Sequence, residues 1–260
     1  MADEQTKLKA IIKKELQATD SEIELFSKSL DSFLFKQLSK LLGPLEVKDY
    51  KAAEFQQVLG SLKANLYAAG LEQLLNRIDN IYGRQIEYVR DYFSNMGKDK
   101  IFSDIDLDII QNLISYDVEK VTTRVSEYVT DVKKTFQTAV LSGEVPNFNT
   151  AHEKYGPRVE ADITTELNTA VQGFSRAVTA GKAKDLGFDL FIYIGPDDDV
   201  TRDFCTQVLS KDPPIYTTDE IDALDNRQGL SVMTFGGGYN CRHQWRPITE
   251  EAARQLGYDI

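Results

Sequence analysis

Cysteine and histidine are scarce in this sequence, which has two of each among its 260 residues. Two cysteines cannot form the disulfide framework of a small secreted protein. Apolar runs are also short, a few residues at most, whereas a membrane-spanning helix needs about 20. We therefore expect no membrane span. The first residues lack the basic and then apolar pattern of a secretory signal, which indicates an intracellular protein.

Basic residues are also fewer than acidic ones. The chain has 30 lysines and arginines against 41 acidic residues, a formal net charge of −11 at pH 7. Binding to a phosphate backbone needs a basic surface, so sequence-specific recognition of nucleic acid is not expected. With 42% hydrophobic residues the chain is not disordered, and its length fits one or two globular domains.

Helix breakers are rare in the first half of the chain, where Pro44 is the only proline before Pro146. Apolar residues recur at steps of three and four between residues 23 and 42, which predicts a helix ended by Gly43 and Pro44. A second apolar run spans residues 59–93 and contains isolated glycines at positions 70 and 83. These glycines make one unbroken helix less favourable there.

A third segment has the clearest helical pattern. Ser103 and the acids after it resemble a capped helix start, and no glycine or proline follows before Ser142. One helix of roughly 60 Å could span that distance. Its apolar residues form a heptad seam: Ile114, Val118, Val121, Val125, Tyr128 and Val132. Such a seam belongs either to the core of a simple bundle or to an arm that binds a partner or another copy of the chain.

The Gly/Pro/Asn cluster at residues 143–147 is the best candidate domain boundary. It separates an elongated all-α region, residues 1–145, from a small α+β domain, residues 146–260. We expect the first region to dock on a partner. The overall fold class is therefore α+β.

The second region mixes helices and strands. The pattern predicts a helix over 158–180 that Gly181 ends, a strand over 188–194, a short helix carrying Cys205, and a second strand over 231–235. Thr217 and Glu220 have the spacing of a capping box, and Thr249 resembles the cap of a last helix. The acids at 197–199 precede the Cys205 helix and fit a role in capping it.

Three soft ligands lie in this second region: Cys205, Cys241 and His243. Thiolates and imidazole are ligands that zinc prefers, and a fourth ligand would be Asp203, another carboxylate or water. The paired C-x-x-C spacing of many zinc sites is missing, so Cys205 could equally be a small core residue.

A thiol nucleophile is the alternative chemistry, with His243 activating Cys205 or Cys241. Residues 236–238 are three glycines that could offer backbone N–H groups to an oxyanion, although a turn with close backbone approach explains them as well. His152 lies in a polar segment, which we interpret as a loop, and no role is expected for it.

An ordered set of motifs runs from Gly195-Pro196-Asp197 through Thr201-Arg202-Asp203-Phe204-Cys205 to Gly237-Gly238-Tyr239-Asn240-Cys241-Arg242-His243, Trp245 and Pro247. This set resembles the C-terminal signature of the bacteriophage Mu F-like minor head (head morphogenesis) proteins, and the resemblance covers roughly the last 100 residues. Many relatives carry two cysteines at each of two places, whereas this chain keeps one at each, with His243 where a second thiol would stand. The matching signature residues are Asp197, Thr201, Arg202, Asp203, Cys205, Gly237, Gly238, Asn240, Cys241, Arg242, His243 and Trp245.

The resemblance implies a virion component of a tailed phage, made in the host cytoplasm and associated with the portal vertex. Its partners would be the portal protein, the major capsid protein or both, and it would act in head assembly or DNA ejection. It implies no catalytic residue and no cofactor. The alternative is a zinc- or thiol-dependent hydrolase carried in the virion, centred on Cys205, Cys241 and His243.

Overall fold

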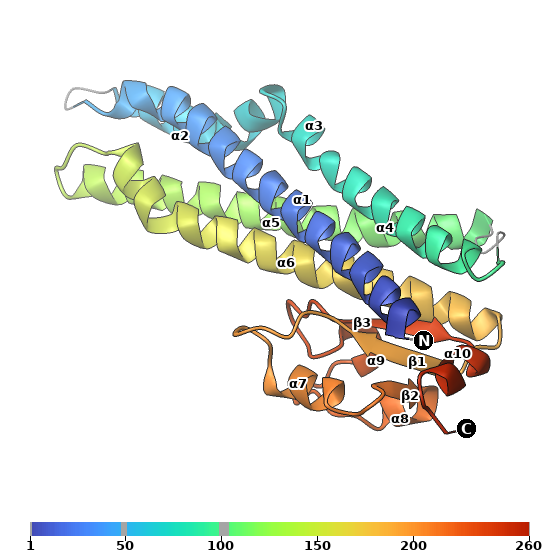
Figure 1. Ribbon diagram of the computed structural model, residues 1–260. Helices are drawn as coiled ribbons and strands as arrows, with labels where there is room; N and C mark the ends of the chain where they lie inside the picture. The colour runs from blue at the N-terminus through green and yellow to red at the C-terminus, as the bar shows by residue number, and fades with distance from the viewer. Residues whose placement is uncertain (1, 48–50, 99–103, 260) are drawn as a thin grey trace. The chain divides into compact units, whose positions relative to one another are not determined.

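The computed structural model describes residues 2–47, 51–98 and 104–259. The chain is α+β, as expected, with long helices followed by a small antiparallel sheet (Figure 1). No helix within the described ranges is both long and apolar enough to cross a membrane. The elements are α1 (Ala2–Leu42), η1 (Gly43–Leu45), α2 (Ala52–Ala68), α3 (Leu71–Leu75), α4 (Arg77–Ser94), α5 (Asp104–Leu141), α6 (Phe148–Asp185), β1 (Leu190–Ile194), α7 (Asp203–Leu209), β2 (Ile215–Thr217), α8 (Thr218–Asp222), α9 (Val232–Phe235), β3 (Gln244–Ile248) and α10 (Glu250–Gln255).

The chain forms two compact units, and each draws on separated stretches of sequence. Unit 1 comprises residues 1–21, 81–107 and 168–260, and unit 2 comprises residues 22–80 and 108–167. The units do not divide at residue 145. Residues 143–147 are the connection between α5 and α6, and both of these helices contribute residues to both units.

The helix ends in the first half follow local breakers. Helix α1 stops at Leu42 directly before Gly43, as predicted. The second apolar run is interrupted at Gly70, whose φ of +108° is a left-handed conformation that other residues rarely adopt. Gly83, by contrast, lies inside α4 and does not break it.

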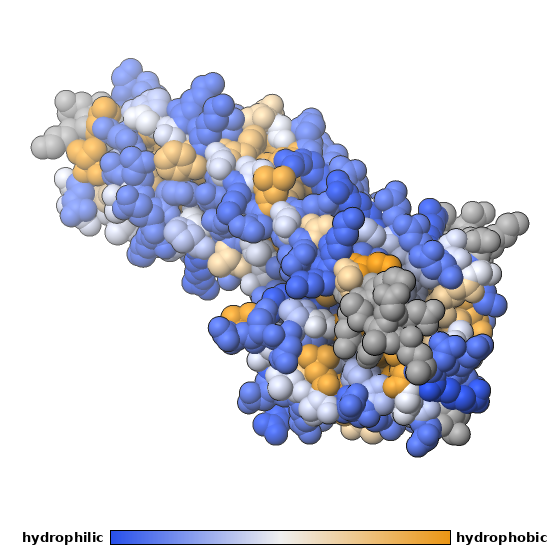
Figure 2. All heavy atoms as spheres, viewed as in Figure 1, coloured by the Kyte–Doolittle hydropathy of each residue, from blue (hydrophilic) through white to orange (hydrophobic). Residues whose placement is uncertain are grey.

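The heptad seam of α5 is buried by the protein's own chain. The long helix is present, although the start expected at Ser103 lies outside the described residues. Five of the six seam residues are buried and Val118 is half-buried. Figure 2 shows a mainly hydrophilic surface on the face drawn, with apolar side chains scattered over it. The seam is therefore core rather than a free surface for a partner, which is the first of the two interpretations that the sequence allowed.

Helix α6 is longer than predicted at both ends. It begins at Phe148, where the Asn147 side chain accepts a hydrogen bond from the Thr150 N–H at 2.9 Å, and it continues through Pro157. Gly181 does not cap it, because the helix runs on to Asp185 and Gly187 takes the positive φ of 78°. Buried Phe148 and Ala151 extend its apolar face toward the N-terminus, which explains the earlier start.

The sheet in unit 1 has the strand order β2-β1-β3, and both pairings are antiparallel. Side chains of β1 alternate between two apolar clusters. Phe191 and Tyr193 face one cluster with Trp245, whereas Leu190, Ile192 and Ile194 join Ile12 and Leu16 of α1 in the other. Both faces of the central strand are therefore buried, which explains its continuous apolar sequence.

Two assignments near the C-terminus differ from prediction. Residues 231–235 are not a strand: Ser231 caps the short helix α9 by accepting a hydrogen bond from the Thr234 N–H, and Gly236 ends it. A strand that the sequence did not predict, β3, lies at Gln244–Ile248 and contains Gln, Arg and Pro. Pairing with β1 makes this segment a strand although these residues have a low preference for strands. The capping box at Thr217 and the cap at Thr249 are confirmed.

Candidate metal centre

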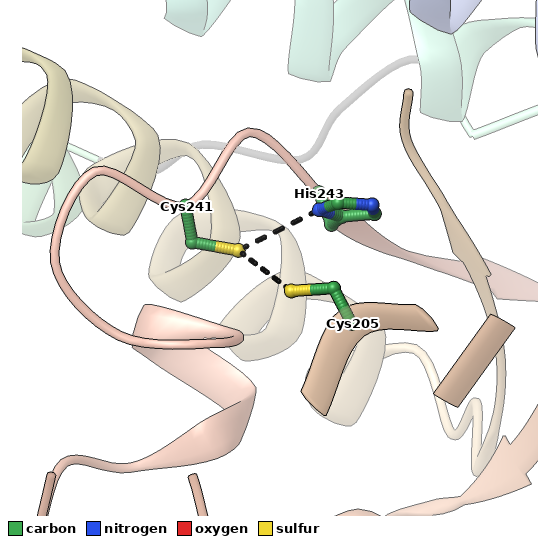
Figure 3. A group of neighbouring side chains, drawn as sticks. All are labelled: Cys205, Cys241 and His243. Atoms are coloured by element: carbon green, nitrogen blue, oxygen red, sulfur yellow. Dashed lines mark hydrogen bonds between the residues drawn. The ribbon is translucent and has the colours of Figure 1, made fainter. Parts of the chain in front are cut away.

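The structure brings Cys205, Cys241 and His243 together in unit 1. Cys205 lies on α7, and the other two lie on the segment that leads into β3 (Figure 3). The Cys205 and Cys241 Sγ atoms are 3.8 Å apart, and Cys241 Sγ is 3.8 Å from Nδ1 of His243. All three potential ligand atoms lie within 4.8 Å of one another. The sequence hypothesis of a shared thiol and imidazole cluster therefore fits the fold.

All three side chains are buried, with exposed fractions of 2%, 2% and 3% for Cys205, Cys241 and His243. Asp203 is at the exposed start of α7 and does not join the cluster, which corrects its assignment as a possible fourth ligand. His243 Nδ1 points at Cys241, whereas its Nε2 is buried and has no hydrogen-bond partner among the described residues.

Tyr193, which the sequence did not single out, completes the cluster. It is the fourth residue of β1, and its hydroxyl donates to Cys205 Sγ at 3.4 Å and lies 3.8 Å from Cys241 Sγ. Its ring stacks on His243, with centroids 5.1 Å apart and an interplanar angle of 10°. A buried tyrosine in a strand is usually a packing residue, so only the pairing of β1 with β3 identifies it as a neighbour of the cluster.

Arg176 on α6 holds the segment that carries two of these residues. Its Nη1 donates to the carbonyls of Cys241 at 3.2 Å and His243 at 2.6 Å, and its Nε donates to the Thr234 carbonyl at 2.6 Å. Arg176 as a whole is 1% exposed. A buried arginine among carbonyls fixes backbone position, and no sequence pattern revealed this role.

The environment favours a negative charge on Cys241. The hydrogen bond with Cys205, followed by those with His243 and the nearby charge of Arg176, lowers the pKa of the Cys241 thiol, whereas the Cys205 thiol has a raised pKa because it shares its proton with Cys241. The Gly237 N–H also donates to Cys241 Sγ at 3.2 Å. Hydrogen bonds to the charged form of a thiol stabilise the thiolate, which is the metal-binding form.

Three glycines pack directly against the three ligand residues. A Cβ on Gly237 would lie 2.4 Å from Cys205 Sγ, one on Gly236 would lie 2.9 Å from Cys241 Sγ, and one on Gly195 would lie 2.3 Å from Cδ2 of His243. Real Cβ atoms do not approach other atoms so closely. The glycines at 236 and 237 therefore allow close approach to the thiols, which agrees with their interpretation as a turn with close backbone approach.

Residues 195–202 contact residues 237–243. The Arg242 guanidinium donates to Asp198 at 2.6 Å and lowers the pKa of that carboxyl to about 2, and Arg202 donates to the Tyr239 carbonyl. Asp198 also accepts a hydrogen bond from the Thr201 hydroxyl at 3.1 Å. The N-cap of α7 is Arg202 and has no side-chain cap, so Asp198 holds a loop and the acids at 197–199 do not cap the helix.

A cleft of about 780 Å³ lies within unit 1 beside the cluster. Its lining includes Tyr193, Gly195 and Arg242, together with Asp20 from α1. Cys205, Cys241 and His243 are not among its lining residues. A substrate in this cleft would therefore contact neither thiol.

The second histidine lies in unit 2 and not in a loop. His152 is on α6, where its Nδ1 is 2.7 Å from the Tyr128 hydroxyl and its ring packs edge-on against Phe35 at 4.8 Å between centroids. The Oδ1 atom of Asp31 lies 3.9 Å from its Nε2. This histidine helps to pack α1, α5 and α6.

Comparison with known proteins adds no relative to this description. The chain matches no protein-family model, no curated protein and no solved structure.

Proposed function

We propose that this protein is a minor head (head morphogenesis) structural protein of a tailed bacteriophage, associated with the portal vertex and acting in head assembly, DNA ejection or both. The observation that carries the proposal is the packing of the two signature segments into one centre. Residues 195–205 and 237–245 resemble the Mu F-like proteins in sequence, and here they meet through Asp198 and Arg242, through Arg202, and through the two thiols.

The burial of the thiols favours a structural role over the alternative, a zinc- or thiol-dependent hydrolase. A nucleophile or a catalytic metal must be reachable by substrate, and catalytic zinc keeps an open position. Cys205 and Cys241 are each 2% exposed and do not line the neighbouring cleft. The centre therefore suits a group that holds the fold of unit 1.

The proposed partners are the portal protein, the major capsid protein or both. Docking would involve surfaces other than the α5 seam, because that seam is buried within this chain. Long helices still supply extended exposed faces for such contacts.

The test is the location of the protein in phage-producing cells. Particles are separated from soluble protein on a density gradient, and this chain is detected by an antibody in each fraction. We expect it in the head fraction and, in cryo-EM maps reconstructed without imposed symmetry, as helical density at the portal. Detection only in the soluble fraction, with normal infectious heads from a strain that lacks the gene, would overturn the proposal.

A further inference from the structure

We propose that unit 1 binds one structural zinc ion through Cys205, Cys241 and His243, with the Tyr193 hydroxyl at the fourth corner. This inference goes beyond the proposed function and does not depend on it, because it rests only on the geometry of the cluster. Two thiolates and an imidazole are the ligand types that favour zinc over magnesium or calcium.

Two distances within the cluster are close to those of a tetrahedral site. Two sulfurs each about 2.3 Å from a tetrahedral zinc lie about 3.8 Å apart, and a sulfur and an imidazole nitrogen lie about 3.5 Å apart. The Sγ–Sγ distance here is 3.8 Å, and the distance from Cys241 Sγ to Nδ1 of His243 is 3.8 Å. All three ligand atoms lie within 4.8 Å of one another, so binding one ion requires the third pair, Cys205 Sγ and Nδ1 of His243, to lie about 3.5 Å apart.

Tyr193 stands where a fourth ligand belongs. Its hydroxyl oxygen is 3.4 Å from one sulfur and 3.8 Å from the other. An oxygen and a sulfur on the same tetrahedral zinc are about 3.5 Å apart. Because the site is buried, a protein oxygen at this corner closes it, as structural zinc sites require.

The surrounding residues hold the ligands in place in the way that metal sites demand. Arg176 fixes the carbonyls of both Cys241 and His243, and the Gly237 N–H donates to Cys241 Sγ. Gly195, Gly236 and Gly237 leave the space that the three ligand side chains occupy. Such supporting contacts orient the ligands and strengthen metal binding.

Two other uses of the thiols fit less well. A disulfide needs an S–S distance of about 2.05 Å, and the sulfurs are 3.8 Å apart with a histidine and a tyrosine directed at them. A nucleophile needs access, and both thiols are buried. A metal ion accounts for the convergence of all four side chains.

The experiment measures metal in the full chain, purified under reducing conditions without a histidine tag. We expect one zinc per chain by elemental mass spectrometry. After chelation, titration of the wild-type protein with cobalt should give the visible absorption of tetrahedral cobalt with thiolate ligands, at one equivalent. These measurements use the wild-type chain and do not depend on the folding of any variant.

The variants separate ligands from bystanders. Cys205→Ser and Cys241→Ser should abolish the cobalt spectrum, whereas His152→Gln, which alters the other histidine, should leave it unchanged. Tyr193→Phe should weaken zinc binding about 10- to 100-fold in competition with a chromophoric chelator. Gly237→Ala should also weaken it, whereas Gly181→Ala, whose Cβ would meet nothing within 4 Å, should not.

Several results would overturn the inference. Folded wild-type protein that holds no zinc and gives no cobalt spectrum would do so, as would zinc retained by the double Cys205→Ser, Cys241→Ser variant. A stable Cys205–Cys241 disulfide in protein free of metal would also refute it. Unchanged affinity in Tyr193→Phe would overturn the assignment of the fourth corner. None of these outcomes depends on whether the protein enters virions.

Discussion

The two units bury different kinds of side chain. Unit 2 is helical, and its buried residues are nearly all apolar. Of the buried polar and charged side chains that the structure describes, only Ser27 belongs to unit 2, whereas the others lie in unit 1, including Arg176, Arg246 and His243. The helical unit therefore depends mainly on hydrophobic packing, and the mixed unit depends in addition on specific polar pairings between distant parts of the chain.

The largest expected effect is in unit 1, at the ion pair between Arg246 and Glu15. Arg246 Nη2 lies 3.0 Å from Glu15 Oε2, with side-chain exposures of 3% and 13%. Arg246→Met should lower the free energy of unfolding by about 3–5 kcal/mol, because it leaves a buried carboxylate without its partner. Chemical denaturation monitored by circular dichroism measures the change.

The control for this ion pair is Arg254→Met. Arg254 pairs with Glu250 at 2.9 Å, but both side chains are more than half exposed. This change should cost about 0.3–0.5 kcal/mol. Equal losses in the two variants would mean that burial does not raise the contribution of the Arg246–Glu15 pair to stability.

The next largest effect is in unit 2, on the α5 seam. Ile114 is 4% exposed and its neighbour Leu113 is 43% exposed. Ile114→Ala should cost about 2–5 kcal/mol through the cavity it leaves. Leu113→Ala should stay within about 0.5 kcal/mol of the wild type. Both are measured on the isolated protein by denaturant unfolding. An unchanged stability of Ile114→Ala would show that the seam packs against a partner and not against this chain.

The smallest effect is the pH dependence of the loop contact between Asp198 and Arg242. The hydrogen bond from Arg242 lowers the pKa of Asp198 from 3.8 to about 2. A lowered carboxyl pKa contributes stability that is present above the ordinary value and is lost as the pH falls through the folded value. The difference in Tm between wild type and Asp198→Asn should therefore be constant above about pH 4 and shrink between pH 3.8 and 2.

The matched variant for this pH effect is Glu24→Gln in unit 2, where Lys28 lowers the pKa of an exposed carboxyl on the same helix. Its effect on Tm should be small at every pH, because the pair is local to one helix turn. A pH-independent difference for Asp198→Asn would contradict the role of Arg242 in holding that carboxyl ionised.

Helix positions were predictable wherever neighbouring residues in the chain decide them. The end of α1 at Leu42, the end of α5 at Leu141 and the capping box at Thr217 follow from residues within four positions of each other. The strand β3 was missed, because its Gln, Arg and Pro have little preference for a strand and only pairing with β1 imposes that conformation. Residues 231–235 were assigned wrongly, because the Ser231 cap outweighed their β-branched and aromatic composition.

The candidate centre was predictable in part. Cys205, Cys241 and His243 were recognisable by residue type, since few side chains of this sequence bind soft metals. Tyr193 and Arg176 were not, because a tyrosine in a strand and an arginine in a helix have common structural roles. Asp203 was favoured by closeness in sequence to Cys205, yet its position on the exposed side of α7 directs it away from the cluster.

The amino-acid sequence is enough to specify most helices of unit 2, because helical periodicity is a property of residues close in sequence. It also identifies the three candidate ligands, because ligand chemistry is a property of single side chains. The folded chain alone decides that the α5 seam is core, that Glu15 pairs with Arg246 across 231 positions, and that Tyr193 joins the thiols. These outcomes depend on which distant segments pack together. That packing is governed by the burial and polar pairing of the whole unit and has no periodic signal in the sequence.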